Sequence, residues 1–394
     1  MKKRTIHDLS VTGQRVFIRV DFNVPLTADG GISSDSRIRK SLPTLRRVME
    51  QGARVVLASH LGRPKGGVGP SLAPVAQRLT ELLGQPVALA PDCVGPRVEE
   101  MVSRLPPGGV LLLENVRFHA GEEKNDPELA KGFARLADVV VNDAFGTAHR
   151  AHASNVGVAK LVPPAVAGLL MADELEFFHR AMIAPQRPVA ALLGGSKVST
   201  KIQLIESLLG KMNAILLGGA MAFTFLKARG GTVGDSLVEE EMLNVATRTE
   251  AHAKQSGVDL LLPVDAVISQ HRDGSGPTRI VAAHQIPDGW MGLDVGPETL
   301  RLYASRLASV ATIVWNGPVG VFEIPAFAHG TLELARIIAD GQALSVAGGG
   351  DTEAAIAQAG VAERISHIST GGGAFLELLE GKDLPGVAVL ADAV

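Results

Sequence analysis

Short apolar runs rich in β-branched residues recur along the whole chain, and segments with helical periodicity separate them. Helical patterns cover residues 71–83, 200–209 and 332–339. Alternation of a buried strand with an amphipathic helix is typical of an α/β fold with mainly parallel sheets. In such sheets the ligand site forms outside the carboxyl ends of the strands. The residues directly after each apolar run are therefore the first candidates for a ligand site.

Each of nine runs ends in a polar motif, and the motifs differ between the two halves of the chain. In the first half they carry Asp, Asn, Arg and His, and they lie at residues 21–23, 60–63, 114–117 and 143–150. In the second half they carry glycines with Lys, Thr or Asp, and they lie at residues 194–197, 218–219, 316–323, 348–352 and 371–373. Arginine side chains bind small anions, whereas glycine turns let backbone N–H groups approach nucleotide phosphates. The sequence therefore predicts two half-sites that must meet.

Residues 194–201, GGSKVSTK, form one candidate phosphate site. If a helix begins at Ser196, Lys197 and Lys201 lie on one face of its first turn. Two ammonium groups near a positive helix terminus favour a bound polyphosphate. The spacing differs from that of a Walker-type loop. The alternative is a turn followed by surface lysines.

The run of glycines at 348–350 is a second candidate, because it precedes a predicted helix. Close approach of backbone to phosphate would explain three glycines, and Asp351 could then meet a phosphate-bound Mg²⁺. The alternative is that Asp351 or Thr352 only caps the helix. Residues 369–373 repeat the arrangement before a helix expected over 374–379.

Residues 315–323, WNGPVGVFE, combine turn residues with apolar ones and end in a carboxylate. They suit a pocket for a base and a ribose, with Glu323 accepting from sugar hydroxyls. An ordinary strand, turn and strand with an exposed Glu323 is the alternative.

For the arginines of the first half, the alternative is a solvated surface position.

Composition narrows the classes of protein. A hydrophobic content of 46% with 20% charged residues indicates a globular chain. The net charge is −3, made of +6 in residues 1–165 (22 basic, 16 acidic) and −9 in the rest (16 basic, 25 acidic). The basic residues are scattered singly and aromatics are few, which argues against a nucleic-acid surface. No apolar stretch is long enough for a membrane span, and none follows the basic N-terminus as in a secretory signal.

The single cysteine, Cys93, fits a reducing cytosol and is expected to be a small buried hydrophobe. No His/Cys cluster in the sequence has the spacing of zinc ligands. The segment Val162-Pro163-Pro164 predicts a domain boundary, because its prolines break the preceding element. A helix expected over 168–182 would then link the two halves.

The motifs together resemble the phosphoglycerate kinase family, in order through nearly the whole chain. They are RVDFNVP at 19–25, SHLGRP at 59–64, ENVRFH at 114–119, DAFGTAHRAHAS at 143–154, GGSKVSTK at 194–201, LGGAMAFTFL at 217–226, WNGPVGVFE at 315–323, GGGDT at 348–352 and STGGGAFLELLEGKDLPG at 369–386. The resemblance implies reversible phosphoryl transfer between ATP and 3-phosphoglycerate, giving ADP and 1,3-bisphosphoglycerate in glycolysis. It also implies a cytoplasmic monomer that binds small molecules, with Mg²⁺ as cofactor and no nucleic-acid or membrane partner.

The resemblance further implies two doubly wound, Rossmann-like α/β domains of mainly parallel sheet joined by a hinge helix. We expect a 3-phosphoglycerate-binding domain over 1–167, the hinge helix over 168–182 and a nucleotide-binding domain over 183–375. The tail, 376–394, is expected to return to the N-terminal domain.

By the same resemblance, residues of the first half hold the substrate. The glycerate end is expected at Asp21, Asn23 and Arg37, and the substrate phosphate at His60, Arg63, Arg117 and Arg150. Residues of the second half hold the nucleotide: Lys201, Gly218, Pro318, Val321, Glu323, Gly349, Gly350, Asp351 and Thr352, with Asp351 on the metal. The residues expected to act in the transfer itself are Arg37, Lys197, Gly372 and Gly373.

The chemistry of the residues agrees with this assignment. A substrate carboxylate is already an ionised nucleophile, so no His–Asp dyad is needed, and in-line transfer depends on positioning and charge neutralisation. Two other classes remain open. A nucleotide-linked oxidoreductase would need a dinucleotide fingerprint, which is missing. A non-catalytic nucleotide-binding protein would show substitutions at Lys197, Asp351 or Arg37, and all three are intact.

Overall fold

The chain folds into two compact units, each built around a parallel sheet of its own. A computed structural model describes residues 2–64 and 66–393. The first unit comprises Met1–Glu176 together with Asp383–Val394, and the second comprises Phe177–Lys382. The chain passes from the first to the second within helix α6 (Leu169–Phe178), which continues into a π-helical turn, η5 (His179–Ile183).

The first unit is built on a six-stranded parallel sheet with the strand order β3-β4-β2-β1-β5-β6. The strands are β1 (Arg15–Arg19), β2 (Arg54–Ala58), β3 (Val87–Leu89), β4 (Val110–Leu112), β5 (Val139–Asn142) and β6 (Ala165–Ala167). The helices are α1 (Ser36–Glu50), α2 (Ala73–Leu83), α3 (Pro96–Ser103), α4 (Pro127–Ala134), α5 (Val158–Leu161) and, at the end of the chain, α14 (Pro385–Ala388). The chain leaves β1 toward β2 and later returns to β5 on its other side. The switch point, where ligands bind in such sheets, therefore lies between β1 and β5.

The second unit has a six-stranded parallel sheet of its own, with the order β10-β8-β7-β15-β16-β17. Its strands are β7 (Val189–Leu193), β8 (Ala214–Leu217), β10 (Asp259–Leu261), β15 (Thr312–Asn316), β16 (Leu344–Ala347) and β17 (His367–Ile368). Its helices are α7 (Ile202–Leu208), α8 (Met221–Ala228), α9 (Leu243–Gln255), α10 (Pro297–Leu307), α11 (His329–Asp340), α12 (Gly350–Gln358) and α13 (Gly372–Leu379). By the same reasoning its switch point lies between β7 and β15.

Two small sheets complete the second unit. An antiparallel sheet joins β11 (Asp265–Ser269), β12 (Thr278–Ala282) and β14 (Met291–Val295), and a two-stranded parallel pair joins β9 (Thr232–Val233) and β13 (Gln285–Ile286). The prediction of an α/β fold with two mainly parallel sheets is confirmed. All nine runs that end in motifs supply strands of the two six-stranded sheets.

The central strands of both large sheets are buried on both faces, as expected when helices cover a parallel sheet, whereas β3, β10 and β17 are partly exposed. Every residue of β7 is buried, and in β1 only Arg15 is partly exposed. The predicted helices are present, with shifted ends. For example, α2 begins at Ala73 rather than at residue 71, because the Ser71 hydroxyl binds Glu114 and the Ala73 N–H instead of entering the helix. Among the described helices, none is both long and apolar enough to cross a bilayer.

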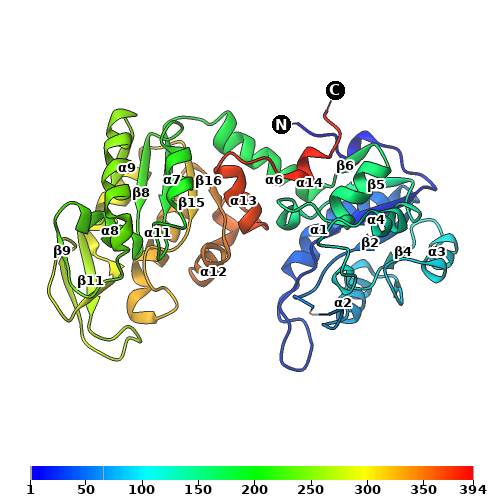
Figure 1. The fold of residues 1–394 in the computed structure, drawn as a ribbon, viewed down its shortest axis with the longest axis horizontal. Coiled ribbons are helices and arrows are strands. Elements are labelled where there is room, and N and C mark those ends of the chain that lie inside the picture. The colour runs from blue at the N-terminus through cyan, green and yellow to red at the C-terminus, as the bar shows by residue number, and fades with distance from the viewer. Residues whose placement is uncertain (1, 65, 394) are drawn as a thin grey trace. The chain divides into compact units, whose positions relative to one another are not determined.

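The end of the chain completes the first unit beside β6 (Figure 1). The Arg4 N–H donates to the Ala391 carbonyl at 2.8 Å, and the Ala391 N–H donates to Ala165 at 2.9 Å. One turn earlier, the Gly386 N–H donates to the Ala148 carbonyl, and the buried Asn142 amide donates to the Gly386 carbonyl at 3.0 Å. Both termini are thus held by backbone hydrogen bonds to the same sheet.

We expect Gly386→Val to detach this terminal segment. A Cβ at residue 386 would lie 2.9 Å from Ala148 Cα and 3.0 Å from its carbonyl oxygen, both backbone atoms that cannot move aside easily. Overpacking of this kind costs about 1–3 kcal/mol. Hydrogen exchange and limited proteolysis should show residues 383–393 opening first. Gly210→Ala, in open space, is the control; equal protection of the segment in both variants would contradict the expectation.

Candidate active site

The carboxyl end of the first sheet gathers polar groups around Asp21, which follows β1. The Asp21 carboxylate forms an ion pair at 2.6 Å with Arg37, which projects from the first turn of α1. The Asn23 side-chain oxygen accepts the Gly62 N–H at 2.8 Å, so the loops after β1 and β2 are joined. Asp21, Asn23 and Arg37 therefore lie together, as predicted for the glycerate end.

His60 lies beside this group, with its Nδ1 atom 3.9 Å from an Asp21 carboxylate oxygen. The guanidinium of Arg19, itself buried in β1, lies 3.3 Å from the same Nδ1. Because a guanidinium can only donate, Nδ1 must accept, and the ring proton must then reside on Nε2. Burial together with the neighbouring Arg19 charge holds the pKa of His60 far below its usual value. His60 is thus a neutral side chain whose Nε2–H has no acceptor among the residues that the structure describes.

The buried Arg19 has a buried acidic partner that the sequence did not single out. Arg19 Nε donates to Ser154 Oγ at 2.8 Å, and the Ser154 hydroxyl and N–H both donate to Glu122. Glu122 is fully buried, and burial raises its pKa despite the Arg19 charge. His152 lies 3.7 Å from Glu122, and burial, with Arg19 nearby, lowers the pKa of His152 to about 4. The one signal of this buried network in the sequence was a charged residue, Arg19, within the apolar run of β1.

The remaining predicted cations sit at the rim of this cluster. Arg117 donates to the Gly62 carbonyl at 2.7 Å and pairs with Glu123 at 3.2 Å, and Arg150 approaches the same Glu123 at 4.0 Å. Arg63 follows Gly62, is exposed and, within the described residues, has no hydrogen bond or ion pair. The first unit thus presents a group of cations and one neutral imidazole, which can bind an anion carrying several oxygens.

In the second unit, a cavity of about 430 Å³ opens near the carboxyl ends of its large sheet. Four of the predicted nucleotide-binding residues line it: Pro318, Val321, Glu323 and Asp351. Apolar walls also come from residues that the sequence did not suggest, namely Phe223, Leu237, Met291, Leu293 and Val295. Gly218 does not line the cavity; it is buried behind it against Val319. A largely apolar cavity with a few polar groups suits a nucleobase with its sugar.

Glycine contacts bring the loops after β7, β8 and β15 together behind this cavity. A Cβ on Gly194 would overlap the Pro318 carbonyl, and a Cβ on Gly219 would overlap the backbone of Gly195. Gly219 also has a φ of +68°, which favours glycine. These contacts leave no room for side chains, so three strand ends converge on one place.

The expectation of a helix beginning at Ser196 is wrong, because α7 begins only at Ile202. Val198 is buried and the Ser199 N–H and hydroxyl are held by Glu239, a residue from a distant segment, which keeps 196–201 in turns. Lys197 is consequently exposed on the loop, not on a helical face with Lys201. Lys201 contacts the Asn316 side-chain oxygen, and burial lowers its pKa to about 8.

The glycine-rich start of α12 has no side-chain cap. Gly349, with a φ of +106°, precedes the helix, and no side chain caps it, so the alternative, capping by Asp351 or Thr352, is not observed. Thr352 instead accepts the Gly317 N–H at 2.8 Å and donates to the Gly348 carbonyl at 3.0 Å. Asp351 remains exposed at the cavity, beside the first turn of the helix.

The start of α13 adjoins the start of α12. A Cβ on Gly372 would lie 3.0 Å from Gly349 Cα, so the two helix N-termini nearly touch through glycines. Gly373 is the second residue of α13 and is exposed. Two adjacent helix N-termini with free N–H groups can bind a polyphosphate.

Comparison with known proteins decides the family. The family model described as phosphoglycerate kinase matches residues 6–382. The chain belongs to the phosphoglycerate kinase family. It is 55% identical over 394 residues to the cytosolic phosphoglycerate kinase of Nicotiana tabacum, covering 99% of this chain and 98% of that one. It is 53% identical over 412 residues to the phosphoglycerate kinase of Synechococcus sp. (strain JA-3-3Ab), covering 100% of both.

Solved structures of phosphoglycerate kinases have the same fold. The structure from Coxiella burnetii matches with a TM-score of 0.90 at 43% identity, covering 98% of each chain. The structure from Pyrococcus horikoshii OT3 matches with a TM-score of 0.84 at 35% identity and the same coverage. The chain is therefore a phosphotransferase of this family, and the resemblance inferred from its motifs is confirmed.

We expect Glu122→Gln to destabilise the first unit strongly, because it removes the buried carboxylate that faces the buried Arg19 guanidinium through Ser154. Loss of a buried charge partner costs up to about 3–5 kcal/mol. The neighbouring Glu123→Gln, at an exposed carboxylate, is the matched control and should cost about 1 kcal/mol or less. Urea denaturation of both variants measures the difference. Equal midpoints would show that Glu122 is not the counter-ion.

Proposed function

We propose that the chain reversibly transfers a phosphoryl group from ATP to 3-phospho-D-glycerate, giving ADP and 1,3-bisphosphoglycerate, as a step of glycolysis. The observation that carries the proposal is the division of chemistry between the units within this family. One switch point is lined by cations and a neutral histidine, and the other unit holds an apolar cavity beside glycine-rich helix starts. An assay of ADP formation that depends on 3-phosphoglycerate tests it; ADP formed equally without that substrate would contradict it.

In the first unit, Asp21, Asn23 and Arg37 would hold the glycerate end of the substrate. The substrate phosphate would lie among His60, Arg63, Arg117 and Arg150. The exposed Arg63 and the Nε2–H of His60 support this, because both are donors that remain free for a ligand.

In the second unit, the nucleotide would occupy the cavity. Pro318 and Val321 would contact adenine, with Gly218 behind them, and Glu323 would accept from the ribose hydroxyls. Lys201, Gly349, Gly350 and Thr352 would contact or frame the phosphates. The open space at Gly350 supports this assignment. Among the described residues, no atom would lie within 4 Å of a Cβ placed on Gly350, so an incoming group has room there.

Mg²⁺ fits the same region through Asp351. Magnesium is usually held by one or two carboxylates together with substrate phosphates, and Asp351 offers an exposed carboxylate at the cavity. The ion would neutralise charge on the phosphates. The chain's own contribution there is to place one carboxylate beside two helix N-termini.

Transfer would need no general base, because the attacking 3-phosphoglycerate carboxylate is ionised at neutral pH. Arg37 and Lys197 would neutralise the charge of the phosphoryl group in transit, and the N–H groups of Gly372 and Gly373 would bind its oxygens. Water must be excluded, or ATP would be hydrolysed, so we propose that the two units close on each other around the hinge helix once both substrates are bound.

We further propose that the protein acts as a monomer in the cytoplasm on these small molecules, without nucleic-acid or membrane partners. The cytosolic relative from Nicotiana tabacum supports the location. The scattered basic residues and scarce aromatics of the sequence support the absence of a nucleic-acid partner.

Lys197→Ala should lower kcat far more than it raises the KM for ATP. Lys197 is exposed on a loop, and its charge would act mainly on the phosphoryl group in transit. Its removal should therefore destabilise the transition state more than the bound nucleotide. We expect a loss of about 2–3 kcal/mol, roughly 30- to 150-fold in kcat. Steady-state kinetics against Lys211→Ala, a lysine outside the site, gives the comparison; unchanged kcat would remove Lys197 from this role.

Arg63→Ala should mainly raise the KM for 3-phosphoglycerate, because a remote phosphate is bound alike in ground and transition states. In the parent that KM should also rise with salt, since ions screen the attraction between the arginines and an anionic substrate. The variant's salt dependence should be shallower. If the variant kept this KM and lost affinity only for ATP, the substrate assignment of the first unit would be wrong.

Nucleotide affinity should fall as the pH rises above about 8. Burial lowers the pKa of Lys201 in the free protein to about 8, so the side chain becomes neutral above that pH, whereas a bound polyphosphate requires its charge. Loss of this one charge between pH 7 and 9 should weaken ADP binding roughly tenfold. Titration calorimetry measures this, and adenosine, which lacks phosphates, should show no such dependence. A flat profile for ADP would exclude Lys201 from phosphate binding.

A further inference from the structure

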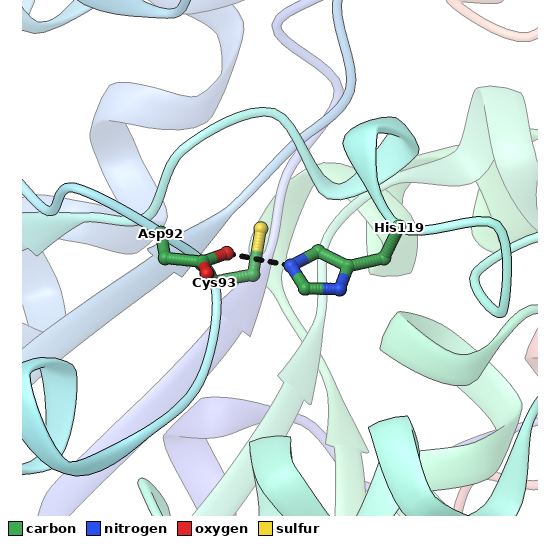
Figure 2. A group of neighbouring side chains, drawn as sticks. All are labelled: Asp92, Cys93 and His119. Carbon is green, nitrogen blue, oxygen red and sulfur yellow. Dashed lines mark hydrogen bonds and ion pairs between the residues drawn. The ribbon is translucent and has the colours of Figure 1, made fainter. Parts of the chain in front are cut away.

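Three side chains with different donor atoms meet in the first unit, away from the cluster around Asp21. Asp92 and Cys93 lie in the loop between β3 and α3, and His119 follows the 3-10 turn η2 (Val116–Phe118). One carboxylate oxygen, the sulfur and one ring nitrogen all lie within 4.8 Å of one another. Figure 2 shows the Asp92 carboxylate directed at the His119 ring, with the Cys93 side chain beside them. None of the three has a part in the proposed reaction.

The surrounding structure holds the Cys93 sulfur and the His119 backbone in place, whereas the Asp92 side chain can move. Asp92 Oδ1 accepts both the Cys93 N–H and the His119 ring N–H, each at 2.6 Å. Cys93 is fully buried, and its thiol donates to the Glu114 carbonyl at 3.0 Å. The His119 backbone is fixed as well, since its N–H binds Val116 and its carbonyl binds the Glu122 N–H. Rigid donors lose little conformational freedom when they bind a ligand.

We propose that Asp92, Cys93 and His119 form a site for a divalent, thiophilic transition metal of the zinc class. Sulfur, imidazole nitrogen and carboxylate oxygen are the three zinc donors, and three protein ligands leave a fourth position for water. On binding, the thiol proton passes to solvent and the thiolate bonds to the metal. The charges of one thiolate and one carboxylate then balance those of the ion. Glu114 loses only a weak S–H donor.

The distances allow this with small movements. Tetrahedral zinc with bonds of about 2.0–2.3 Å places its ligand atoms about 3.3–3.6 Å apart. Asp92 must therefore move back from His119, to which it is now bound at 2.6 Å, and its side chain, 55% exposed, is free to do so. The sulfur, fixed by burial, supplies the anchor. The site would join the loop before α3 to the segment that carries Arg117.

This site is distinct from the one proposed for Mg²⁺. Magnesium prefers oxygen ligands only and keeps several waters, so a thiolate with an imidazole selects against it. The inference rests on the geometry of three side chains and is independent of the proposed reaction.

Cobalt titration tests the proposal directly. Co²⁺ substitutes for zinc and gives a thiolate-to-metal charge-transfer band in the near ultraviolet. Because Cys93 is the single cysteine of the chain, such a band can only come from this place. We expect one equivalent to produce the band in the full-length protein, with excess Mg²⁺ leaving it unchanged and Zn²⁺ removing it. Absence of the band at saturating Co²⁺ would overturn the proposal.

Variants separate a three-ligand site from a lone thiol. His119→Gln keeps a hydrogen-bond donor for Asp92 but removes a metal ligand, and should weaken Co²⁺ binding by at least tenfold, as loss of supporting groups alone does. His252→Gln is the matched control, since His252 pairs with Glu206 at 2.8 Å in the other unit, where there is no cysteine. Zn²⁺ should raise the melting temperatures of the parent and of His252→Gln. It should raise the melting temperature of His119→Gln much less. Equal Co²⁺ affinity in the two variants would mean that the thiol binds alone, and would refute the site.

Discussion

Parallel pairing in both large sheets governs where chemistry can occur in this protein. Because every strand points the same way, each connection must return through a helix, and the loops at one edge come from distant parts of the sequence. At the switch points, between β1 and β5 and between β7 and β15, neighbouring loops turn away from each other and leave room for a ligand. The cation cluster of the first unit and the apolar cavity of the second follow from this arrangement of the backbone.

Each unit builds its site in a different way. In the first, the buried Arg19 lies beside His60 and, with burial, keeps it neutral, while Ser154 links Arg19 to the buried Glu122. In the second, the constraint lies in the backbone, since glycines replace side chains wherever the loops after β7, β8 and β15 meet. A charged network suits recognition of a compact anion, whereas bare backbone suits the close approach of phosphates.

The sequence predicted those features that depend on local pattern. Apolar runs located the strands, and their ends located Asp21 in the first unit and Glu323 and Asp351 in the second, since strand ends share an edge. Arg37, which lies in α1, came only from the family resemblance. It failed where a distant side chain decides the local structure. Glu239 holds Ser199 outside the helix that the pattern favoured, and Glu122 belongs to a loop with no pattern linking it to Arg19. Such pairings depend on tertiary packing, which periodicity does not record.

The interleaving of the two chain ends has a consequence for synthesis of the protein on the ribosome. Lys3 and Arg4 make their strand-like contacts with Asp392 and Ala391, which are translated after the whole of the second unit. The second unit, Phe177–Lys382, is contiguous and can fold as soon as it emerges. The first unit, although begun earlier, lacks its closing segment until residues 383–393 have followed the second unit. Cotranslational folding should therefore finish at the beginning of the chain, after the second unit has formed.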